Sequence, residues 1–414
     1  MKKTVLLSIA ASTLIMAGGD IAPAEPVIEE STNIGIFNNV KFSGELRPRY
    51  EYADDSVNDE ANAFTTRFAL SVKTELAGIE GLSAFGQIMA VTNFGYDEYA
   101  PEQSGYALIA DPQNARVTQA YLDYKIGDTS ISAGRQMVNL DDQRFIGAVG
   151  WRQMPQTFMG YTLKNSSIEN LDLMAMYVTD IYGVTDALTT GTESVFLHAD
   201  YMAMPELKLS AYGYLLGHQV FGSDTYGLMA SGKVGMFNYI AEAATQQDAS
   251  LEYNSMGKPD VDAMYYRGDL STTYNGFIFG AAYESLGDAD GNTHGFTTPL
   301  ATLHKWQGFA DVFLGYTGRN GNEFGLEDLY GKVGYASPKF GKLLALYHTF
   351  STQETDGILS DDAGSELDLL YTYNFSNGLN FLAKAAFFSG ETDSVIGAAQ
   401  NDVTKYWVQL DYNF

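Results

Sequence analysis

The chain has 414 residues, with 24 Lys and Arg against 51 Asp and Glu, which gives a formal net charge of −27. It contains no cysteine, so disulfide frameworks, thiolate metal sites and cysteine nucleophiles are excluded. Because affinity for nucleic acid comes mainly from Lys and Arg that neutralise phosphates, we expect no nucleic-acid partner.

Enzyme motifs are also missing from the sequence. It has no Gly-x-Ser-x-Gly elbow and no His-Glu-x-x-His helix, and its five histidines show no ligand spacing. We therefore expect no catalytic site, no cofactor and no metal site, and we do not expect an enzyme.

Residues 1–24 have the pattern of a secretory signal peptide. Lys2 and Lys3 form a basic start, residues 5–17 are apolar, and Ala22-Pro23-Ala24 is a small-residue cleavage site. The apolar stretch is too short for a helix that spans a bilayer, which needs about 20 residues. The sequence therefore predicts an exported protein, with residues 25–39 as a periplasmic N-terminal lead.

Residues 40–414 repeatedly alternate polar and apolar side chains. In segment 41–51 one face carries Phe42, Leu46 and Tyr50, and the other carries Glu45, Arg47, Arg49 and Glu51. In the last segment one face carries Tyr406, Val408, Leu410, Tyr412 and Phe414, and the other carries Lys405, Trp407, Gln409 and Asp411. Segments 67–73, 119–126 and 366–375 behave similarly, with only Leu370 on the wrong face. A period of two predicts strands.

A soluble sandwich and a membrane barrel both explain such alternation. Length favours the barrel, because about nineteen segments with strand character fill the chain and its connections alternate between short and long. Residues 126–129 form a tight turn, whereas residues 94–112, 248–260 and 286–305 form long polar connections. The 28 tyrosines and 24 phenylalanines suit interfacial aromatic girdles.

The predicted fold is all-β, a single transmembrane antiparallel up-and-down barrel formed by residues 40–414. Bacterial single-chain barrels have an even number of strands, so one of the nineteen segments is not a barrel strand. Segment 311–317 is the weakest and fits a loop or a constriction inside the lumen. We predict about 18 strands, with 16 as the alternative, short turns on the periplasmic side and long loops outside.

Several short motifs resemble the alginate export family of outer-membrane barrels. They include Gly134-Arg135-Gln136 and Trp151-Arg152-Gln153, within a similar stretch at residues 115–163, and a second block at residues 301–350. The resemblance extends from about Val40 to the C-terminus. It implies a monomeric eighteen-stranded barrel in the Gram-negative outer membrane, with an arginine-lined lumen that passes anionic polysaccharide.

Arginines are the most informative charged residues, since seven of the nine lie within the first 152 positions. On the lipid face an arginine costs about 2–4 kcal/mol at the bilayer midplane, so we place them in the lumen. For Arg116, strict alternation from Ala120 points outward unless a bulge shifts the register. The candidates for lining the pore or setting its selectivity are Arg47, Arg49, Arg67, Lys73, Asp123, Lys125, Arg135, Arg144 and Arg152.

Two interpretations of these arginines stay open. They either form a selectivity ring or pair in a wall lattice with the carboxylates Glu45, Glu51, Asp123, Asp141 and Asp142. The functional hypothesis is an outer-membrane channel that passes hydrophilic solutes, with an anionic saccharide or polysaccharide as cargo. The alternatives are a general or cation-preferring porin, or a barrel enzyme or adhesin. The expected partners are outer-membrane lipid, a small hydrophilic solute or saccharide, and an unidentified periplasmic protein.

Overall fold

The computed structural model describes residues 32–414 except 186–187, 218–221, 251–259, 293, 320, 356 and 358. The predicted signal peptide, residues 25–31 of the predicted lead and most of connection 248–260 lie outside the described residues. The strands are β1 (Thr32–Ile34), β2 (Phe37–Asp54), β3 (Ala61–Leu76), β4 (Leu82–Thr92), β5 (Asn114–Ile126), β6 (Thr129–Gln136), β7 (Thr157–Ile168), β8 (Leu171–Tyr182), β9 (Leu188–Met204), β10 (Leu207–Leu216), β11 (Ser223–Val234), β12 (Phe237–Asp248), β13 (Asp262–Tyr274), β14 (Phe277–Leu286), β15 (Leu326–Ser337), β16 (Gly341–Ser351), β17 (Asp362–Asn374), β18 (Leu379–Ser389) and β19 (Val403–Asn413). The helical turns are η2 (Leu303–Lys305), α1 (Leu314–Gly318) and η3 (Gly397–Gln400). No helix among these residues is long and apolar enough to cross a bilayer.

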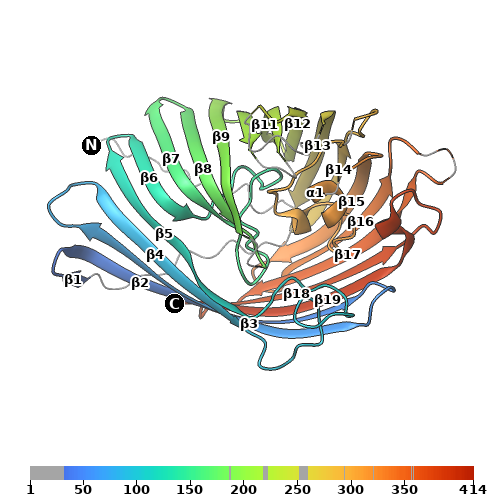
Figure 1. Ribbon diagram of the computed structural model, residues 1–414, viewed down its shortest axis with the longest axis horizontal. Helices are drawn as coiled ribbons and strands as arrows, with labels where there is room; N and C mark the ends of the chain where they lie inside the picture. Colours follow the sequence, from blue (N-terminus) through green and yellow to red (C-terminus); the bar gives the residue numbers. More distant parts are fainter. Residues whose placement is uncertain are drawn as a thin grey trace.

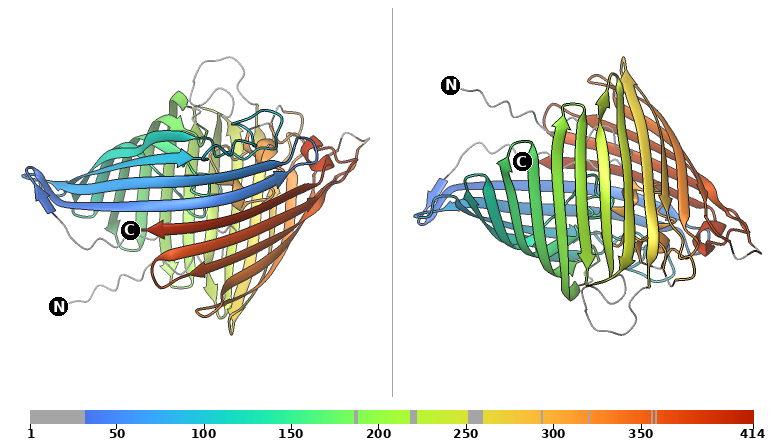
Figure 2. Two further views of the ribbon diagram at one scale, coloured as in Figure 1. Left: turned by 90° about the horizontal axis from the view of Figure 1, so that it is seen from below. Right: turned by 90° about the horizontal axis from the view of Figure 1, so that it is seen from above.

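Strands β2 to β19 form a closed antiparallel barrel. Each pairs with its neighbours in the chain, and β19 returns to pair with β2, where Val408 lies opposite Tyr50. Backbone hydrogen bonds in both directions between Gly44 and Phe414 complete this seam, which Figure 2 shows where the C-terminal strand lies beside β2. The prediction of an 18-stranded all-β barrel is confirmed, and the alternative of 16 strands is wrong.

The extra strand β1 lies within the predicted lead and pairs with β2. Strand β2 already begins at Phe37, three residues before the predicted start of the barrel. Segment 311–317 is not a barrel strand, since most of it forms the helical turn α1 and its N-terminal approach.

The two faces of the barrel wall differ as the alternation predicts. On β2 the side chains of Phe42, Leu46 and Tyr50 are exposed on the outside, while Arg47 and Arg49 are buried inside. On β19 Trp407 and Asp411 are buried inside, whereas Val408 is exposed outside. An outer surface of exposed aromatic and aliphatic side chains is suited to lipid.

A substitution on β11 tests whether this outer surface faces lipid. Leu228 lies at the middle of the strand and is 67% exposed, so Leu228→Arg is expected to lower the free energy of unfolding by about 2–4 kcal/mol in a bilayer. Val234→Arg is the matched control, because Val234 is 61% exposed but ends the strand, where the cost falls to about 0–1 kcal/mol. Urea unfolding of vesicle-inserted protein measures both. If both substitutions lower the free energy of unfolding by the same small amount, the outer surface faces water and not lipid.

Connections alternate in length around the barrel. Tight turns such as residues 127–128, 235–236 and 275–276 lie at one end, and residues 93–113, 137–156 and 287–325 connect strands at the other. The predicted long connections 94–112 and 286–305 match two of these, the second being considerably longer than predicted. In Figure 1 the loop after β6 and the loop that contains α1 lie inside the ring of strands.

Part of the inner wall is apolar because loop 287–325 packs on it. Phe309 and Phe313 of the loop share a buried cluster with Leu344 and Leu370 of the wall. Leu370 therefore departs from the alternation for a physical reason: its inward side chain meets a folded loop instead of water.

Candidate functional site

Loop 137–156 crosses the lumen from one wall to the other. At one end the backbone carbonyls of Gly150 and Trp151 lie against β2. At the other end the guanidinium of Arg144 donates to Glu284 of β14 at 2.5 Å, and Asp142 pairs with Arg267 of β13. The loop therefore narrows the barrel interior.

The wall arginines hold the first of these ends. Arg47 Nη1 donates to the carbonyl of Gly150 at 2.9 Å, and Arg49 Nη2 donates to that of Trp151 at 2.5 Å. Arg67 of β3 donates to the carbonyls of Arg152 and Gln153, both at 3.3 Å. Consecutive loop carbonyls thus have buried cationic donors, and such charge-assisted hydrogen bonds are stronger than neutral ones.

Carboxylates neutralise the positive charges of these arginines. Glu45 pairs with Arg67 and lies 3.0 Å from Arg47. Arg47 also contacts Asp411 of β19 at 3.1 Å. Since each buried charge needs a partner, the lumen wall here is a paired lattice with little uncompensated positive charge.

Arg152 is the centre of the lattice because it joins three loops to the wall. Its guanidinium lies 3.0 Å from Glu51 of β2, 3.6 Å from Asp111 of loop 93–113 and 3.2 Å from Asp311 of loop 287–325. Asp111 also accepts from Arg49 at 3.3 Å. All five side chains are buried, so these contacts fix the relative positions of the three loops.

Asp311 and His304 connect Arg152 to β18. Asp311 contacts both Arg152 and His304, and His304 contacts Lys384 of β18. Burial would raise the pKa of Asp311, but His304, Lys405 and Arg152 together hold it well below its usual range. Burial lowers the pKa of His304 well below its usual range. Its partners assign the tautomer: Nδ1 donates to Asp311 at 2.9 Å and Nε2 accepts from Lys384 at 2.7 Å.

Loop 287–325 is attached to the wall through its backbone. The N–H groups of Phe309 and Ala310 donate to Asp368 at 3.0 Å and to Glu366 at 2.7 Å on β17. Gly308 precedes them with a φ of +83°, and a Cβ there would collide with the Glu366 carboxylate. A glycine is required for this close approach.

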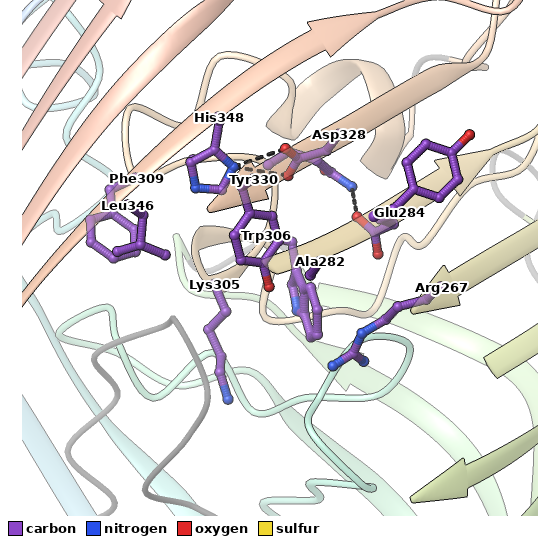
Figure 3. A pocket seen from close by; sticks show the side chains of 13 residues that line it. Arg267, Ala282, Glu284, Lys305, Trp306, Phe309, Asp328, Tyr330, Leu346 and His348 are labelled. Atoms are coloured by element: carbon purple, nitrogen blue, oxygen red, sulfur yellow. Dashed lines mark hydrogen bonds and ion pairs between the residues drawn. The ribbon is translucent and has the colours of Figure 1, made fainter. Parts of the chain in front are cut away.

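A small cavity remains between this loop and the β13–β16 wall (Figure 3). Arg267, Glu284, Tyr330 and His348 of the wall and Trp306 of the loop line it. Its volume of about 10 Å³ has room for about one water molecule. The cavity is therefore a packing gap between loop and wall, too small for a solute.

The structure brings together four of the nine predicted site residues. Arg47, Arg49, Arg67 and Arg152 meet where loop 137–156 contacts β2 and β3. Arg144 lies at the opposite end of the loop, by Glu284. Arg135 is separate: it donates to Thr157 at 2.7 Å and its guanidinium lies 3.6 Å from the ring centre of Tyr182.

The remaining candidates lie near the short-turn end of the barrel. Asp123 accepts from Ser132 at 2.6 Å, and the side chains of Lys73 and Lys125 are exposed. For Arg116 a bulge at Gln87/Ile88 shifts the β4–β5 register. Its guanidinium donates to the carbonyls of Pro155 and Gly183, so the bulge hypothesis for this residue agrees with the structure.

Five charged residues that form ion pairs in the lumen were not predicted from the sequence. Asp411 and Glu284 lie on strands, and the alternation of the last segment already placed Asp411 on the polar face. Asp111 and Asp311 lie in loops, and Arg267 is distant in sequence from the other arginines. No local pattern identifies loop residues that meet across a lumen. Of the carboxylates expected in the lattice, Asp123 and Asp141 have other partners.

Comparison with solved structures finds proteins of the same architecture. The chain resembles OccAB2 of Acinetobacter baumannii with a TM-score of 0.70 and 15% identity, over 92% of this chain and 99% of that one. It resembles OccK9 (OpdG) of Pseudomonas aeruginosa with 0.67 and 18%, over 92% and 100%. It resembles the outer membrane protein OprD of Pseudomonas aeruginosa with 0.64 and 15%, over 94% and 97%. No family model matches the chain. No curated protein matches it either.

These likenesses establish the fold. The eighteen-stranded barrel implied by the sequence resemblance is confirmed, but none of the comparisons supports the alginate export family specifically.

Proposed function

We propose that the protein is a channel of the bacterial outer membrane that passes small hydrophilic solutes by diffusion. The observation that supports this most is a closed barrel with an apolar outer face and a charged, loop-filled interior. A lipid-facing exterior and a polar lumen are the properties of porin barrels. Solved barrels of the same architecture include one named as an outer membrane protein.

The inward loops and the paired charges favour a small polar solute over an anionic polysaccharide. Loops 137–156 and 287–325 both occupy the lumen, so little room is left for a chain of sugars. The arginines contact carboxylates, so a polyanion would find little uncompensated positive charge. Opposed charges across a constriction instead suit solutes that carry both hydrogen-bond donors and acceptors.

The same geometry indicates how eight of the nine candidates act in the channel. We propose that Arg47, Arg49, Arg67, Arg144 and Arg152 set the width of the pore by holding loop 137–156. Lys73, Asp123 and Lys125 would line the periplasmic mouth, where their side chains are more accessible. Each barrel has its own lumen, so a single chain suffices as the conducting unit.

Swelling of proteoliposomes tests the proposal. We expect vesicles that contain the refolded, signal-free protein to swell in an isotonic monosaccharide at a rate proportional to the protein content. Dextran should produce no swelling, because a polysaccharide cannot pass the loops. Vesicles with heat-denatured protein are the control. Entry of dextran would contradict the assignment of a small solute, and absence of swelling in every solute would contradict the channel.

A further inference from the structure

A second polar cluster lies where loop 137–156 contacts β9. Asp141 of the loop meets His198 and Asp200 of β9, and one ligand atom from each lies within 4.8 Å of the other two. His198 Nε2 is 2.7 Å from Asp141 Oδ2. His198 and Asp200 are two residues apart on one strand and therefore share its inner face.

The three side chains are held in place by their surroundings. The side chains of His198 and Asp141 are 7% and 10% exposed. Ser210 of β10 donates to Asp200 Oδ1 at 2.5 Å, and hydrogen bonds of this kind commonly orient side chains that bind a metal. Asp141 has a φ of +47°, in the left-handed region, and its carboxylate contacts His198 of β9.

Water has access to the cluster. A hollow of about 250 Å³ opens beside it, lined by Lys164, Ser166 and Asp172 in addition to the three residues. Ser166 and Asp172 flank the tight turn between β7 and β8, so the hollow extends toward the short-turn end of the barrel. An ion that enters from that end could keep a water molecule as a further ligand.

Lys208 balances the charge of the two carboxylates. Its Nζ atom lies 3.0 Å from Asp200 and 3.4 Å from Asp141. The Lys208 side chain is 29% exposed, so it has room to swing away from the carboxylates. An ion with two positive charges would compensate them better than one ammonium group.

We propose that Asp141, His198 and Asp200 form a site for a divalent transition-metal ion, best matched by Zn²⁺, which ties loop 137–156 to β9. Zn²⁺ takes imidazole nitrogen and carboxylate oxygen at about 2.0–2.2 Å, usually with four ligands. On a tetrahedral ion such donors lie about 3.3–3.6 Å apart, so small side-chain movements suffice. Ca²⁺ and Mg²⁺ prefer oxygen ligands only, so a site that contains His198 discriminates against them.

Calorimetric titration of the refolded protein with Zn²⁺ tests the site, using a protein without a polyhistidine tag. We expect one high-affinity ion per chain, with binding weakened at least about 100-fold by His198→Ala. Asp200→Asn is the second variant, in case His198→Ala does not fold, and it should weaken binding similarly. Lys208→Gln should strengthen binding about tenfold, because it removes a competing positive charge. His294→Ala is the matched control, since His294 lies in loop 287–325 and bridges to Val261.

Folding of each variant is checked by its heat-modifiable mobility on gels. Loss of Zn²⁺ binding in His198→Ala and its retention in His294→Ala would support the site. Zn²⁺ binding that survives both His198→Ala and Asp200→Asn would overturn the proposal. So would a wild-type protein that does not bind Zn²⁺, or one that binds Ca²⁺ as tightly. Binding is measured directly, so the result does not depend on whether the barrel conducts.

Discussion

Replacing residues 138–155 with a four-residue Gly-Ser linker is expected to raise the single-channel conductance several-fold. The loop crosses the lumen between β2 and the β13–β14 wall, so its removal enlarges the narrowest cross-section. A short linker can close the gap because Gln136 of β6 pairs directly with Phe158 of β7. Conductance of the refolded variant in planar bilayers measures the effect.

The loop replacement leaves buried carboxylates without their arginine partners, so Glu51→Gln and Glu284→Gln are included in the same variant. The matched control carries these two changes with the loop intact, so the difference in conductance between the two variants isolates the effect of the loop itself. A second control replaces the exposed residues Ser56, Val57 and Asn58 with glycine. If the loop-replaced barrel folds and its conductance is unchanged, the loop does not narrow the pore.

Arg152→Met is expected to destabilise the packing of the three loops by about 3–5 kcal/mol. The substitution keeps most of the apolar volume but leaves Glu51, Asp111 and Asp311 without their shared guanidinium. Breaking a buried ion pair from one side is costly because the remaining charges stay buried and uncompensated. The temperature at which the folded band is lost on gels should fall, and protease should cleave the loops faster.

Lys125→Met is the matched control for the charge, because Lys125 is exposed at the end of β5 and should change stability by less than about 0.5 kcal/mol. Adding Glu51→Gln and Asp111→Asn to Arg152→Met should restore part of the lost stability, because the two changes remove two of the unpaired negative charges. If Arg152→Met is as stable and as resistant to protease as the wild type, Arg152 is not the centre that holds the loops.

The wall of the barrel could be predicted from the sequence because a period of two is a local property. Alternation alone placed Arg47 and Arg49 inside and Phe42 outside, and the structure agrees. Trp407 also followed the polar face, and it packs inside against Trp151 at an interplanar angle of 72°. Chain length and the parity of bacterial barrels then gave the number of strands.

The contents of the lumen could not be predicted in the same way. Alternation says which face a side chain occupies, but it does not say what that face meets. Arg152 and Asp311 are separated by 159 positions, and nothing near either residue indicates the other. Leu370 was out of phase for the same reason, because its partners lie in a loop more than fifty residues away.

The motifs on which the family resemblance rests have structural roles in this barrel. Gly134-Arg135-Gln136 ends β6, and Trp151-Arg152-Gln153 lies where loop 137–156 meets β2 and β3. Arg49 lies 4.1 Å from the ring centre of Trp151, and Gln153 donates to Thr65 at 3.0 Å. These residues hold a loop inside a barrel, which does not by itself specify a cargo.

Single-channel recording of the unmodified, refolded protein in planar bilayers tests the central claim most directly. A channel narrowed by folded loops predicts discrete current steps of uniform size, one step for each inserted chain. Heat-modifiable mobility on gels establishes beforehand that the barrel is folded. If protein folded by that criterion inserts into the bilayer and produces no current steps, the lumen is closed and the protein is not a channel.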